Sequence, residues 1–270
     1  MPVPAPSPDR AALVTGASSG IGAELARQLA QRGHNVVLVA RRKAEMDALA
    51  AQLASPRVRV EVLPADLTDP AERAAIVQRT ADLGLEIDVL VNNAGLSTLG
   101  PVHRADVERE LQMVELDVMA VVDLTTRFLP GMVDRRSGAV LNVASTAAFQ
   151  PLPGQAGYGA SKAFVLSYSR GLAGELRGTG VTVTALCPGP VDTGFGDAAG
   201  FSKEDAESAL PSFMWESAEA VARAGIAGLE AGDPVAIPGR ANWLAAGVAQ
   251  LAPKRVLVPL LASRHPGLRD

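Results

Sequence analysis

The chain has 270 residues, of which 48% are hydrophobic and 20% are charged, and its 25 basic and 29 acidic side chains give a net charge of −4. This composition excludes a disordered or fibrous chain and favours one packed domain. The longest basic run is Arg41–Lys43, which argues against a nucleic-acid partner. Because a single cysteine, Cys187, excludes an internal disulfide, we expect a reducing, cytoplasmic location.

The first residues form no targeting signal that we can identify. Residues 1–9 alternate prolines with other residues and lack both a basic head and an apolar stretch, which predicts a flexible extended tail. No apolar run in the sequence approaches the ~20 residues that a transmembrane helix needs. We therefore expect a soluble protein without a transmembrane segment.

Apolar, β-branched runs recur along the chain with amphipathic stretches between them. They occupy residues 11–15, 36–40, 58–63, 87–91, 139–143, 181–186 and 235–237. Most are too apolar to leave one face in water, which is typical of parallel strands covered by helices on both faces. Residues 10–239 are thus predicted to form a doubly wound, mostly parallel seven-stranded α/β sheet of Rossmann type. Its ligand crevice should lie beyond the carboxyl ends of the strands.

A glycine-rich turn follows the first strand directly. Residues Thr15–Gly22 place glycines as Gly-x-x-x-Gly-x-Gly before an amphipathic helix. Glycines let the backbone approach a pyrophosphate, and the helix N-terminus offers N–H groups and a positive dipole end. We therefore predict a dinucleotide site, and a plain glycine-rich loop is the alternative. Its predicted contacts are Gly16, Ser18, Ser19, Gly20, Ile21 and Gly22.

The end of the second strand predicts which dinucleotide is bound. An NAD site usually has an acid there that binds the ribose 2′-hydroxyl, whereas this chain has Ala40 followed by Arg41 and Arg42. A guanidinium matches the geometry of a 2′-phosphate and stays charged. NADP(H) is therefore predicted as the preferred cofactor, with NAD(H) possible. Solvated arginines at the start of a helix are the alternative.

Polar and small residues follow the next two strands. Asp66 and Leu67 follow the third strand, and Asn93, Ala94 and Gly95 follow the fourth. Asp66 can accept a hydrogen bond from an adenine amino group, and the small residues can lie beside the cofactor ribose. A helix cap at Asp66 and a turn at Asn93 are the alternatives for each motif alone.

Three residues that follow the fifth strand are predicted to be catalytic. Ser145 follows that strand, and Tyr158 and Lys162 lie four residues apart at the start of an amphipathic helix, so they share one face. The lysine ammonium is expected to lower the pKa of the tyrosine from its ordinary value near ~10. Ser145 is expected to donate a hydrogen bond to the oxygen of a reacting carbonyl.

Together these motifs resemble the short-chain dehydrogenase/reductase family over residues 9–238. The resemblance also includes Pro188–Thr193, and it implies a Rossmann-type fold, an NAD(P)(H) cofactor and tyrosine-centred hydride transfer on alcohols or ketones. It implies cofactor contacts from Pro188, Gly189, Val191 and Thr193, and from Tyr158 and Lys162 as well. Helices at about 104–128 and 157–176 would form a subunit interface, which predicts a homodimer or homotetramer.

The chain departs from the family pattern at two places. Asp117 stands where the family commonly has a catalytic asparagine, and we expect its carboxylate to add negative charge near Lys162 and to alter the pH dependence. The second place is the end of the chain, where residues 240–270 continue as a helical extension that we expect to pack on the same domain. The ending resembles that of reductases acting on apolar ketones or acyl chains.

The substrate site is predicted from apolar side chains near these motifs. The segment 194–217 is rich in aromatic residues, and we expect either a lid over the substrate or ordinary packing. The candidate substrate contacts are Phe149, Gln155, Phe195, Phe213 and Trp215. His34, His103 and His265 lack the spacing of metal ligands and are expected on the surface, so no metal site is predicted.

The sequence therefore predicts an NADP(H)-dependent oxidoreductase that interconverts an apolar carbonyl and a secondary alcohol, with Tyr158 as the acid/base. Two alternatives stay open. The first is a redox-silent protein that binds NADPH as a sensor or scaffold. This alternative is suggested by Asp117, which replaces the usual asparagine of the family. The second is an NAD-dependent alcohol dehydrogenase of the same fold.

Overall fold

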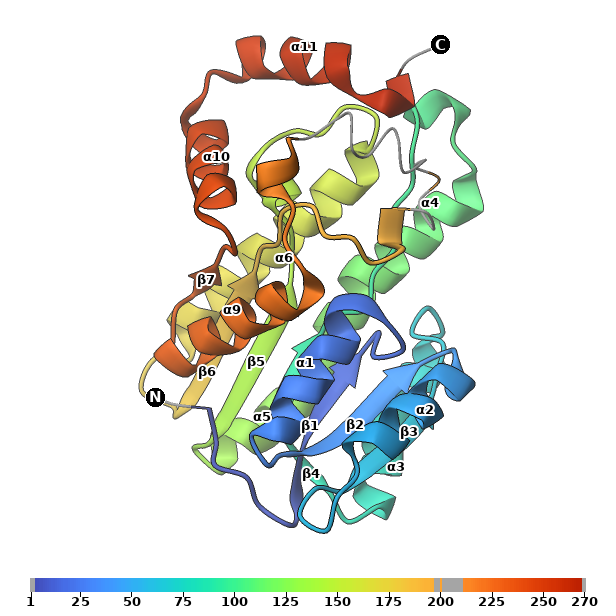
Figure 1. Cartoon of the computed structure of the whole chain (residues 1–270), viewed down its shortest axis with the longest axis vertical. Helices are drawn as coiled ribbons and strands as arrows, with labels where there is room; N and C mark the ends of the chain where they lie inside the picture. The colour runs from blue at the N-terminus through green and yellow to red at the C-terminus, as the bar shows by residue number, and fades with distance from the viewer. Residues whose placement is uncertain (1–2, 197–199, 201–210, 269–270) are drawn as a thin grey trace.

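The computed structural model describes residues 3–196, 200 and 211–268, apart from the side chain of Arg264. In this part of the chain seven strands form one sheet in the order β3-β2-β1-β4-β5-β6-β7, and every neighbouring pair is parallel (Figure 1). The predicted doubly wound sheet is confirmed. The strands are β1 (Arg10–Thr15), β2 (Asn35–Ala40), β3 (Val60–Pro64), β4 (Glu86–Asn92), β5 (Gly138–Val143), β6 (Val181–Leu186) and β7 (Val235–Ala236).

Helices cover both faces of the sheet (Figure 1). They are α1 (Gly20–Gln31), α2 (Lys43–Leu53), α3 (Pro70–Asp82), α4 (Val107–Val114), α5 (Ala120–Asp134), α6 (Ala156–Glu175), α9 (Ala218–Ala231), α10 (Arg240–Leu251) and α11 (Lys254–Arg264). Helices α1, α2 and α9 pack on one face, and α3, α5 and α6 pack on the other. The order of the strands reverses between β1 and β4, so the loops after these two strands flank the crevice.

Strand β1 contributes side chains to the hydrophobic clusters on both faces of the sheet. Ala12 and Val14 pack in the cluster that includes α1, α2 and α9, whereas Ala11 and Leu13 pack in the cluster of α3, α5 and α6. Successive side chains of a strand point to opposite faces, and all four of these are fully buried. Strands buried on both faces are rich in apolar residues because neither face of the sheet meets water.

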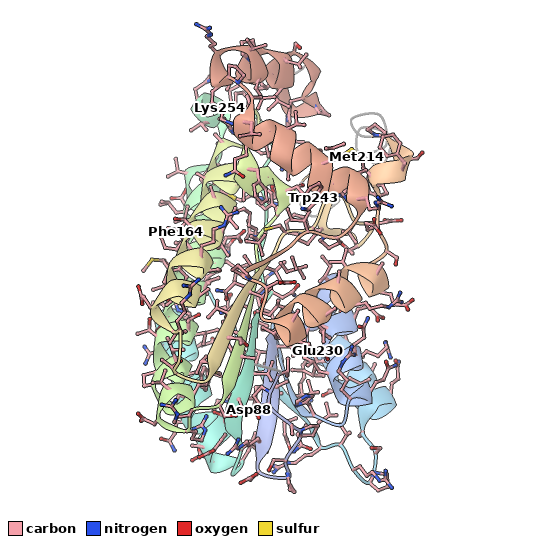
Figure 2. The ribbon with its side chains drawn as sticks, turned by 90° about the vertical axis from the view of Figure 1, so that its left-hand side faces the viewer. Asp88, Phe164, Met214, Glu230, Trp243 and Lys254 are labelled. Atoms are coloured by element: carbon pink, nitrogen blue, oxygen red, sulfur yellow. The ribbon has the colours of Figure 1, made fainter. Side chains whose placement is uncertain are left out.

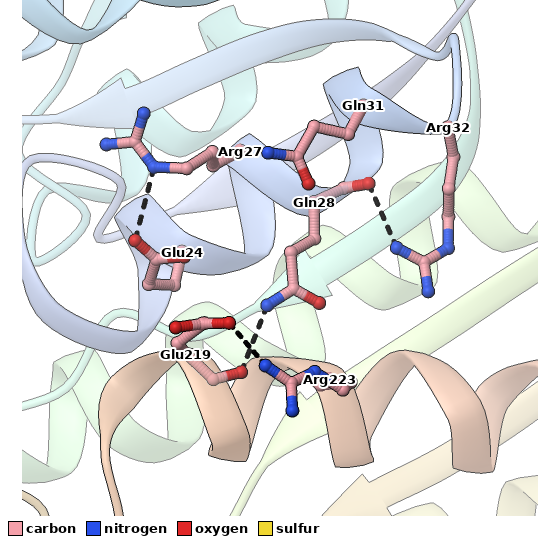
Figure 3. A pocket seen from close by; sticks show the side chains of 7 residues that line it. All are labelled: Glu24, Arg27, Gln28, Gln31, Arg32, Glu219 and Arg223. Atoms are coloured by element: carbon pink, nitrogen blue, oxygen red, sulfur yellow. Dashed lines mark hydrogen bonds and ion pairs between the residues drawn. The ribbon is translucent and has the colours of Figure 1, made fainter.

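Helices α1 and α9 are joined by polar contacts at the rim of a shallow pocket (Figure 3). The Gln28 side chain donates a hydrogen bond to the Glu219 carbonyl over 3.0 Å, and Arg27 and Arg223 each pair with an acid on their own helix. Charged groups in this pocket thus bind one another. We interpret this pocket as part of the packing of α9 on α1.

A π-helical segment, η2 (Glu115–Met119), interrupts the helix expected at about 104–128. It separates α4 from α5 and widens the helix by one residue per turn. Asp117 lies in the middle of this segment and is fully buried. The wider turn places this carboxylate inside the protein, next to the loop after β4.

The residues before β1 are docked on the domain, so the prediction of a flexible tail is wrong for residues 3–9. Val3 packs against the core, and the Asn35 side chain donates hydrogen bonds to the carbonyls of Ser7 and Pro8 over 3.0 and 3.2 Å. Asn35 is buried at the start of β2. A buried amide needs partners, and the carbonyls of Ser7, Pro8 and Arg10 supply them.

The C-terminal helices lie at the end of the molecule where the strands finish (Figure 1). Asn242 is the fully buried polar residue of α10, and its side-chain amide donates to the carbonyls of Met214 and Pro238 over 3.0 and 3.2 Å. Helix α10 is therefore tied to the segment before α9 and to the end of β7. Within the described residues, no helix is both long enough and apolar enough to cross a bilayer.

Asp88 sits at a register irregularity where β4 pairs with β1, near the lower end of the sheet in Figure 2. Its side chain is fully buried and both carboxyl oxygens lack a hydrogen-bond partner. Burial raises the pKa of Asp88 to about 6, against a weaker opposing effect of Arg10. The folded protein therefore holds this proton at a pH where the unfolded chain releases it.

Replacing Asp88 by Asn should change how stability depends on pH. A carboxyl whose pKa is raised by folding costs stability above about pH 6, and this cost of about 3 kcal/mol at pH 8 fades as the pH falls toward 4. We expect the gain of Asp88→Asn over the parent to be about 1–2 kcal/mol larger at pH 8 than at pH 5. Urea unfolding at both pH values measures this difference, and an exposed acid, Asp134→Asn, is the control. Parallel curves for parent and Asp88→Asn would contradict it.

Candidate active site

The loops after β1 and β4 are joined by Thr15. Its Oγ1 donates to the Val91 carbonyl over 3.2 Å and accepts hydrogen bonds from the backbone N–H groups of Asn93 and Ala94 over 2.9 and 3.0 Å. The Asn93 side chain donates back to the Thr15 carbonyl over 2.9 Å. The sequence analysis gave Thr15 no role, although it begins the glycine turn. These bonds fix the floor of the crevice at the switch in strand order.

The glycines of the turn are required by their surroundings. A Cβ on Gly16 would lie 2.8 Å from Asn93 Nδ2, and a Cβ on Gly22 would lie 2.4 Å from the same atom. Gly16 and Gly20 also have positive φ angles of 66° and 57°. Such contacts and angles exclude any larger side chain. The turn thus keeps the close backbone approach that a pyrophosphate needs.

The N-terminus of α1 is open toward the crevice. Ser19 occupies the N-cap position without capping the helix through its side chain, and its hydroxyl instead accepts a hydrogen bond from Arg42 over 2.7 Å. Arg42 also donates to Ser18 over 2.9 Å. Ile21, the remaining predicted contact of this turn, is half-buried against the core and can offer only its backbone. A guanidinium beside an uncapped helix N-terminus is a donor set suited to phosphate.

Arg41 lies apart from these serines. It is exposed, and its charge acts on Asp66, where it helps to lower the pKa of that carboxyl. Burial opposes this effect, and hydrogen bonds from the Thr68 backbone and hydroxyl to Asp66 Oδ1 over 3.0 and 2.8 Å contribute to it. Asp66 therefore keeps one oxygen bonded to Thr68. Of the two arginines predicted for a 2′-phosphate, Arg42 thus contacts the glycine turn and Arg41 acts on Asp66.

Leu67 contributes its side chain to the core rather than to the crevice. Its carbonyl accepts a hydrogen bond from Arg73 over 2.8 Å, and only its backbone can reach a cofactor. Arg73 is almost fully buried and also pairs with Glu115 and Asp123 over 2.7 and 2.8 Å. This arginine, which the sequence analysis missed, connects the loop after β3 to the π-helical segment.

Ser145, Tyr158 and Lys162 come together at the carboxyl end of β5. Ser145 lies close enough to Tyr158 to favour a lower pKa of its phenol, and Lys162 Nζ lies 5.6 Å from the centroid of the Tyr158 ring. Ser145 Oγ also accepts a hydrogen bond from the Ala147 N–H over 3.1 Å, which fixes its orientation. The predicted catalytic residues thus form one cluster.

Asp117 pairs directly with the lysine of this cluster. Its carboxylate lies 3.0 Å from Lys162 Nζ, and its other oxygen accepts a hydrogen bond from the Leu96 N–H over 2.8 Å. Lys162 also donates to the Val143 carbonyl over 3.3 Å. A Cβ on Gly95 would lie 3.2 Å from both charged groups, so the small residue at 95 leaves space for the pair.

Burial, together with the charge of Asp117, reverses the predicted direction of the tyrosine pKa, although Lys162 lowers that pKa as expected. Desolvation raises the pKa of Tyr158, the ammonium of Lys162 lowers it, and the carboxylate of Asp117 raises it again, with a net rise. Burial lowers the pKa of Lys162, but the charges of Asp117 and Tyr158 and the hydrogen bond to Asp117 together outweigh burial and raise that pKa. The pKa of Asp117 is also raised, mainly by burial. Lys162 thus interacts with two groups, the carboxylate of Asp117 and the phenol of Tyr158.

The loop after β6 closes the crevice from the other side. Thr193 faces the glycine turn, since a Cβ on Gly20 would lie 3.0 Å from the Thr193 side chain. Pro188 accepts a hydrogen bond from the Thr146 N–H over 2.8 Å, and Gly189 leaves room for Asn242, which a Cβ would approach to 2.5 Å. Val191 forms a bridge with Glu216. The four residues predicted in this loop therefore run from the catalytic serine to the glycine turn.

The predicted substrate contacts divide into three groups. Phe195 lies beside the catalytic tyrosine, with ring centroids 5.9 Å apart, whereas Phe149 is buried in the core and contacts Arg170, so its assignment to the substrate mouth is wrong. Phe213 is 72% exposed and Trp215 is half-buried. Residues 197–199 and 201–210 of the aromatic segment lie outside the described residues.

Gln155 is held by two partners rather than lying free. It donates to Ser97 Oγ over 2.7 Å, and its carbonyl oxygen lies 3.2 Å from His265 Nε2. His265 is half-buried and His34 is buried, so the expectation that both lie on the surface is wrong. The end of the chain thus reaches the loop before α6. Among the described residues, no group of three or more His, Cys, Asp or Glu side chains could hold a metal ion.

A separate apolar hollow of about 540 Å³ lies next to this loop. It is lined by residues 148–153 and by Ala156, Gly159, Ala160 and Ala163 of α6. These helical positions differ from those of Tyr158 and Lys162, so the hollow opens on another face of α6. It therefore cannot present a substrate to the tyrosine hydroxyl.

Comparison with known proteins agrees with this geometry. The family model described as short chain dehydrogenase matches residues 10–202. The NADP-dependent 3-hydroxy acid dehydrogenase of Salmonella typhi is 42% identical over 183 residues, which cover 66% of this chain and 71% of that protein. Its counterpart in Escherichia coli K12 is 39% identical over the same length.

Two solved structures are similar over nearly the whole chain. A short-chain dehydrogenase from Sphingobium yanoikuyae in complex with NADPH is 36% identical, with a TM-score of 0.78 and coverage of 93% of this chain and 95% of that one. The bulky-bulky ketone specific alcohol dehydrogenase from Comamonas testosteroni is 30% identical, with a TM-score of 0.74 and coverage of 97% of both chains. The chain therefore belongs to the short-chain dehydrogenase family of oxidoreductases.

Proposed function

We propose that this protein is an NADP(H)-dependent oxidoreductase that interconverts a carbonyl compound and a secondary alcohol, with Tyr158 as the acid/base. The observation that carries this proposal is the cluster of Tyr158, Ser145 and Lys162 beside the glycine turn. A phenol that lies beside a serine and an ammonium can exchange a proton with a substrate oxygen.

Each residue has a separate task in this mechanism. A bound nicotinamide would supply or accept the hydride. Ser145 orients the substrate oxygen, and Tyr158 gives that oxygen its proton during reduction and removes it during oxidation. Lys162 stabilises the negative charge on the phenolate, and Asp117 holds Lys162 in place through the 3.0 Å ion pair. The raised pKa of Tyr158 favours its protonated form, which is the form that reduction requires.

The cofactor preference rests on the contacts at the glycine turn. Arg42 lies on the serines of this turn and Arg41 lies nearby, while Ala40 leaves no acid at the end of β2. The 3-hydroxy acid dehydrogenases at about 40% identity are named as NADP-dependent, and the Sphingobium structure holds NADPH. Both observations support NADP(H) as the preferred cofactor of this chain.

Replacing Arg42 by Ala should weaken NADPH binding about tenfold to a hundredfold. Hydrogen bonds between a guanidinium and a charged phosphate contribute about 1.5–3 kcal/mol, and NADH lacks the 2′-phosphate that receives them. Fluorescence titration with NADPH and NADH measures both dissociation constants. Arg57→Ala is the control. Arg57 is exposed in the turn that precedes β3, so it lies at the end of the sheet away from the crevice. An equal loss of affinity for both cofactors would refute the assignment of Arg42.

For the substrate, we propose an apolar ketone or the corresponding alcohol. Phe195 packs beside the catalytic tyrosine, and the similar Comamonas enzyme is described as specific for bulky-bulky ketones. A 3-hydroxy acid is the second candidate, because curated relatives act on that class. NADPH oxidation with bulky ketones and NADP+ reduction with 3-hydroxy acids distinguish the two. Cofactor binding without turnover on either panel would favour the redox-silent alternative.

We also propose that the protein forms a homodimer or homotetramer in the cytoplasm. Apolar side chains of α4 and α6 are exposed, including Val107 and Leu111 at 64% and Phe164 at 42%. Such a patch on two neighbouring helices fits a contact between copies. Light scattering of the purified protein measures the number of subunits.

A further inference from the structure

The C-terminal helices expose most of their large apolar side chains to solvent. We call these residues the C-terminal apolar face. They are Trp243 (64% exposed), Leu244 (61%), Val248 (59%) and Leu251 (86%) on α10, with Val256 (63%) and Leu260 (47%) on α11. Apolar patches of this kind on a folded protein mark surfaces that meet a partner or a membrane.

Burial in α10 is the reverse of the usual arrangement. The helix turns Asn242, Ala246 and Ala249 toward the protein, although none of them has a large apolar side chain. Trp243 and Leu244 point outward instead. An amphipathic helix normally buries its large apolar side chains and leaves its polar ones in water. The outward face of α10 is therefore suited to apolar surroundings outside the chain.

The charge of this segment differs from that of the rest of the chain. Residues 240–270 contain five of the 25 basic side chains but one of the 29 acidic ones, Asp270 at the very end. Lys254 and Arg255 are exposed at the junction of α10 and α11. The segment is thus basic on a protein whose net charge is −4. An apolar face with basic side chains and no acid before the last residue complements a surface that is both apolar and anionic.

The two helices also lie on the outside of the molecule. Figure 1 shows α10 and α11 at one end, with α11 running across that end, and Figure 2 shows Trp243 and Lys254 on this outer layer. The end of this segment contacts the loop before α6 through His265 and Gln155. A flat partner could thus meet both helices at once without covering the rest of the sheet.

We propose that α10 and α11 form a docking surface for an anionic lipid bilayer. The C-terminal apolar face would enter the boundary between headgroups and acyl chains, while Lys254 and Arg255 meet anionic headgroups. A second copy of the chain fits less well, because the same segment of that copy has no acid before Asp270 to pair with Lys254 and Arg255. The inference does not depend on the proposed reaction.

Sedimentation with vesicles tests this inference on the purified full-length protein. We expect binding to phosphatidylcholine and phosphatidylglycerol vesicles mixed at about two to one, with weaker binding to phosphatidylcholine alone and in high salt. Leu244→Glu should lower the partition coefficient at least about tenfold, because it places a charge in the apolar layer. Arg255→Gln should lower it about fivefold, through the loss of one basic side chain.

Val102→Glu is the matched control, because Val102 is exposed to the same 61% as Leu244 but lies in a different segment. It should bind vesicles as the parent does, and thermal melting checks that every variant is folded. Failure of the parent to bind anionic vesicles at low salt would overturn the inference, as would equal losses in Leu244→Glu and Val102→Glu. Light scattering without lipid provides a further test. If Leu244→Glu dissociates an oligomer and vesicle binding is unchanged, the face is a contact between copies and the inference is wrong.

Discussion

Tyr158→Phe is expected to lower turnover by about 10²–10⁴-fold while cofactor affinity stays nearly the same. The substitution removes the hydroxyl that exchanges a proton with the substrate oxygen, and acid–base groups contribute rate factors of this size. The phenyl ring can still pack beside Phe195, so the shape of the site is kept. Steady-state NADPH oxidation with a reactive ketone measures turnover, and fluorescence titration measures the dissociation constant of NADPH.

The other tyrosine of the chain is a matched control. Tyr168 lies on the same helix and stacks with Phe164, with ring centroids 5.8 Å apart, on the side of α6 away from Lys162. Tyr168→Phe should retain turnover within about twofold, since it removes only a hydroxyl that lies away from Lys162 and keeps the half-buried ring in place. Normal turnover in Tyr158→Phe would remove the proposed mechanism, whereas loss of NADPH binding would show that the tyrosine acts on the cofactor instead.

Asp117→Asn is expected to shift the pH profile of alcohol oxidation toward lower pH by on the order of one unit. Oxidation needs the deprotonated phenol, so its rate rises as the pH passes the pKa of Tyr158. The carboxylate of Asp117 raises that pKa, and it pairs with Lys162, whose charge lowers it. Removing the negative charge should thus lower the pKa of Tyr158. Rates of NADP+ reduction measured from pH 6 to 11 locate the midpoint.

A second buried acid provides the control for this experiment. Asp88 is also fully buried, but it lies near the start of β4, at the end of the strand away from the crevice. Asp88→Asn should change stability without moving the midpoint of the activity profile. A midpoint that stays in place or rises in Asp117→Asn would show that the carboxylate does not control the phenol. In that case we would conclude that Asp117 has only a structural role.

The sheet and the order of the motifs were predictable because they depend on local pattern. Parallel strands buried on both faces are recognisable from their apolar runs, and the glycine turn is recognisable from its spacing after β1. The closeness of Tyr158 and Lys162 follows from four residues of helix. These features need no knowledge of which distant residues touch.

The features that were missed depend on contacts between distant segments. The direction of the Tyr158 pKa was predicted wrongly because distant segments bury the phenol, and because the π-helical segment brings Asp117 within 3.0 Å of Lys162. Phe149 was assigned to the substrate, but it fills the core between the β5 loop and α6. The sequence also gave no reason to prefer Arg42 over Arg41 at the serines of the glycine turn.

Asn242 connects the C-terminal helix α10 to the loop after β6, which borders the crevice. One side chain touches Gly189 beside the predicted nicotinamide contacts and binds the carbonyls of Met214 and Pro238, so three segments distant in sequence share a single anchor. Deleting the chain from Arg240 onward would leave both carbonyls without this donor and would open a gap against Gly189. Truncation before α10 should therefore weaken cofactor binding.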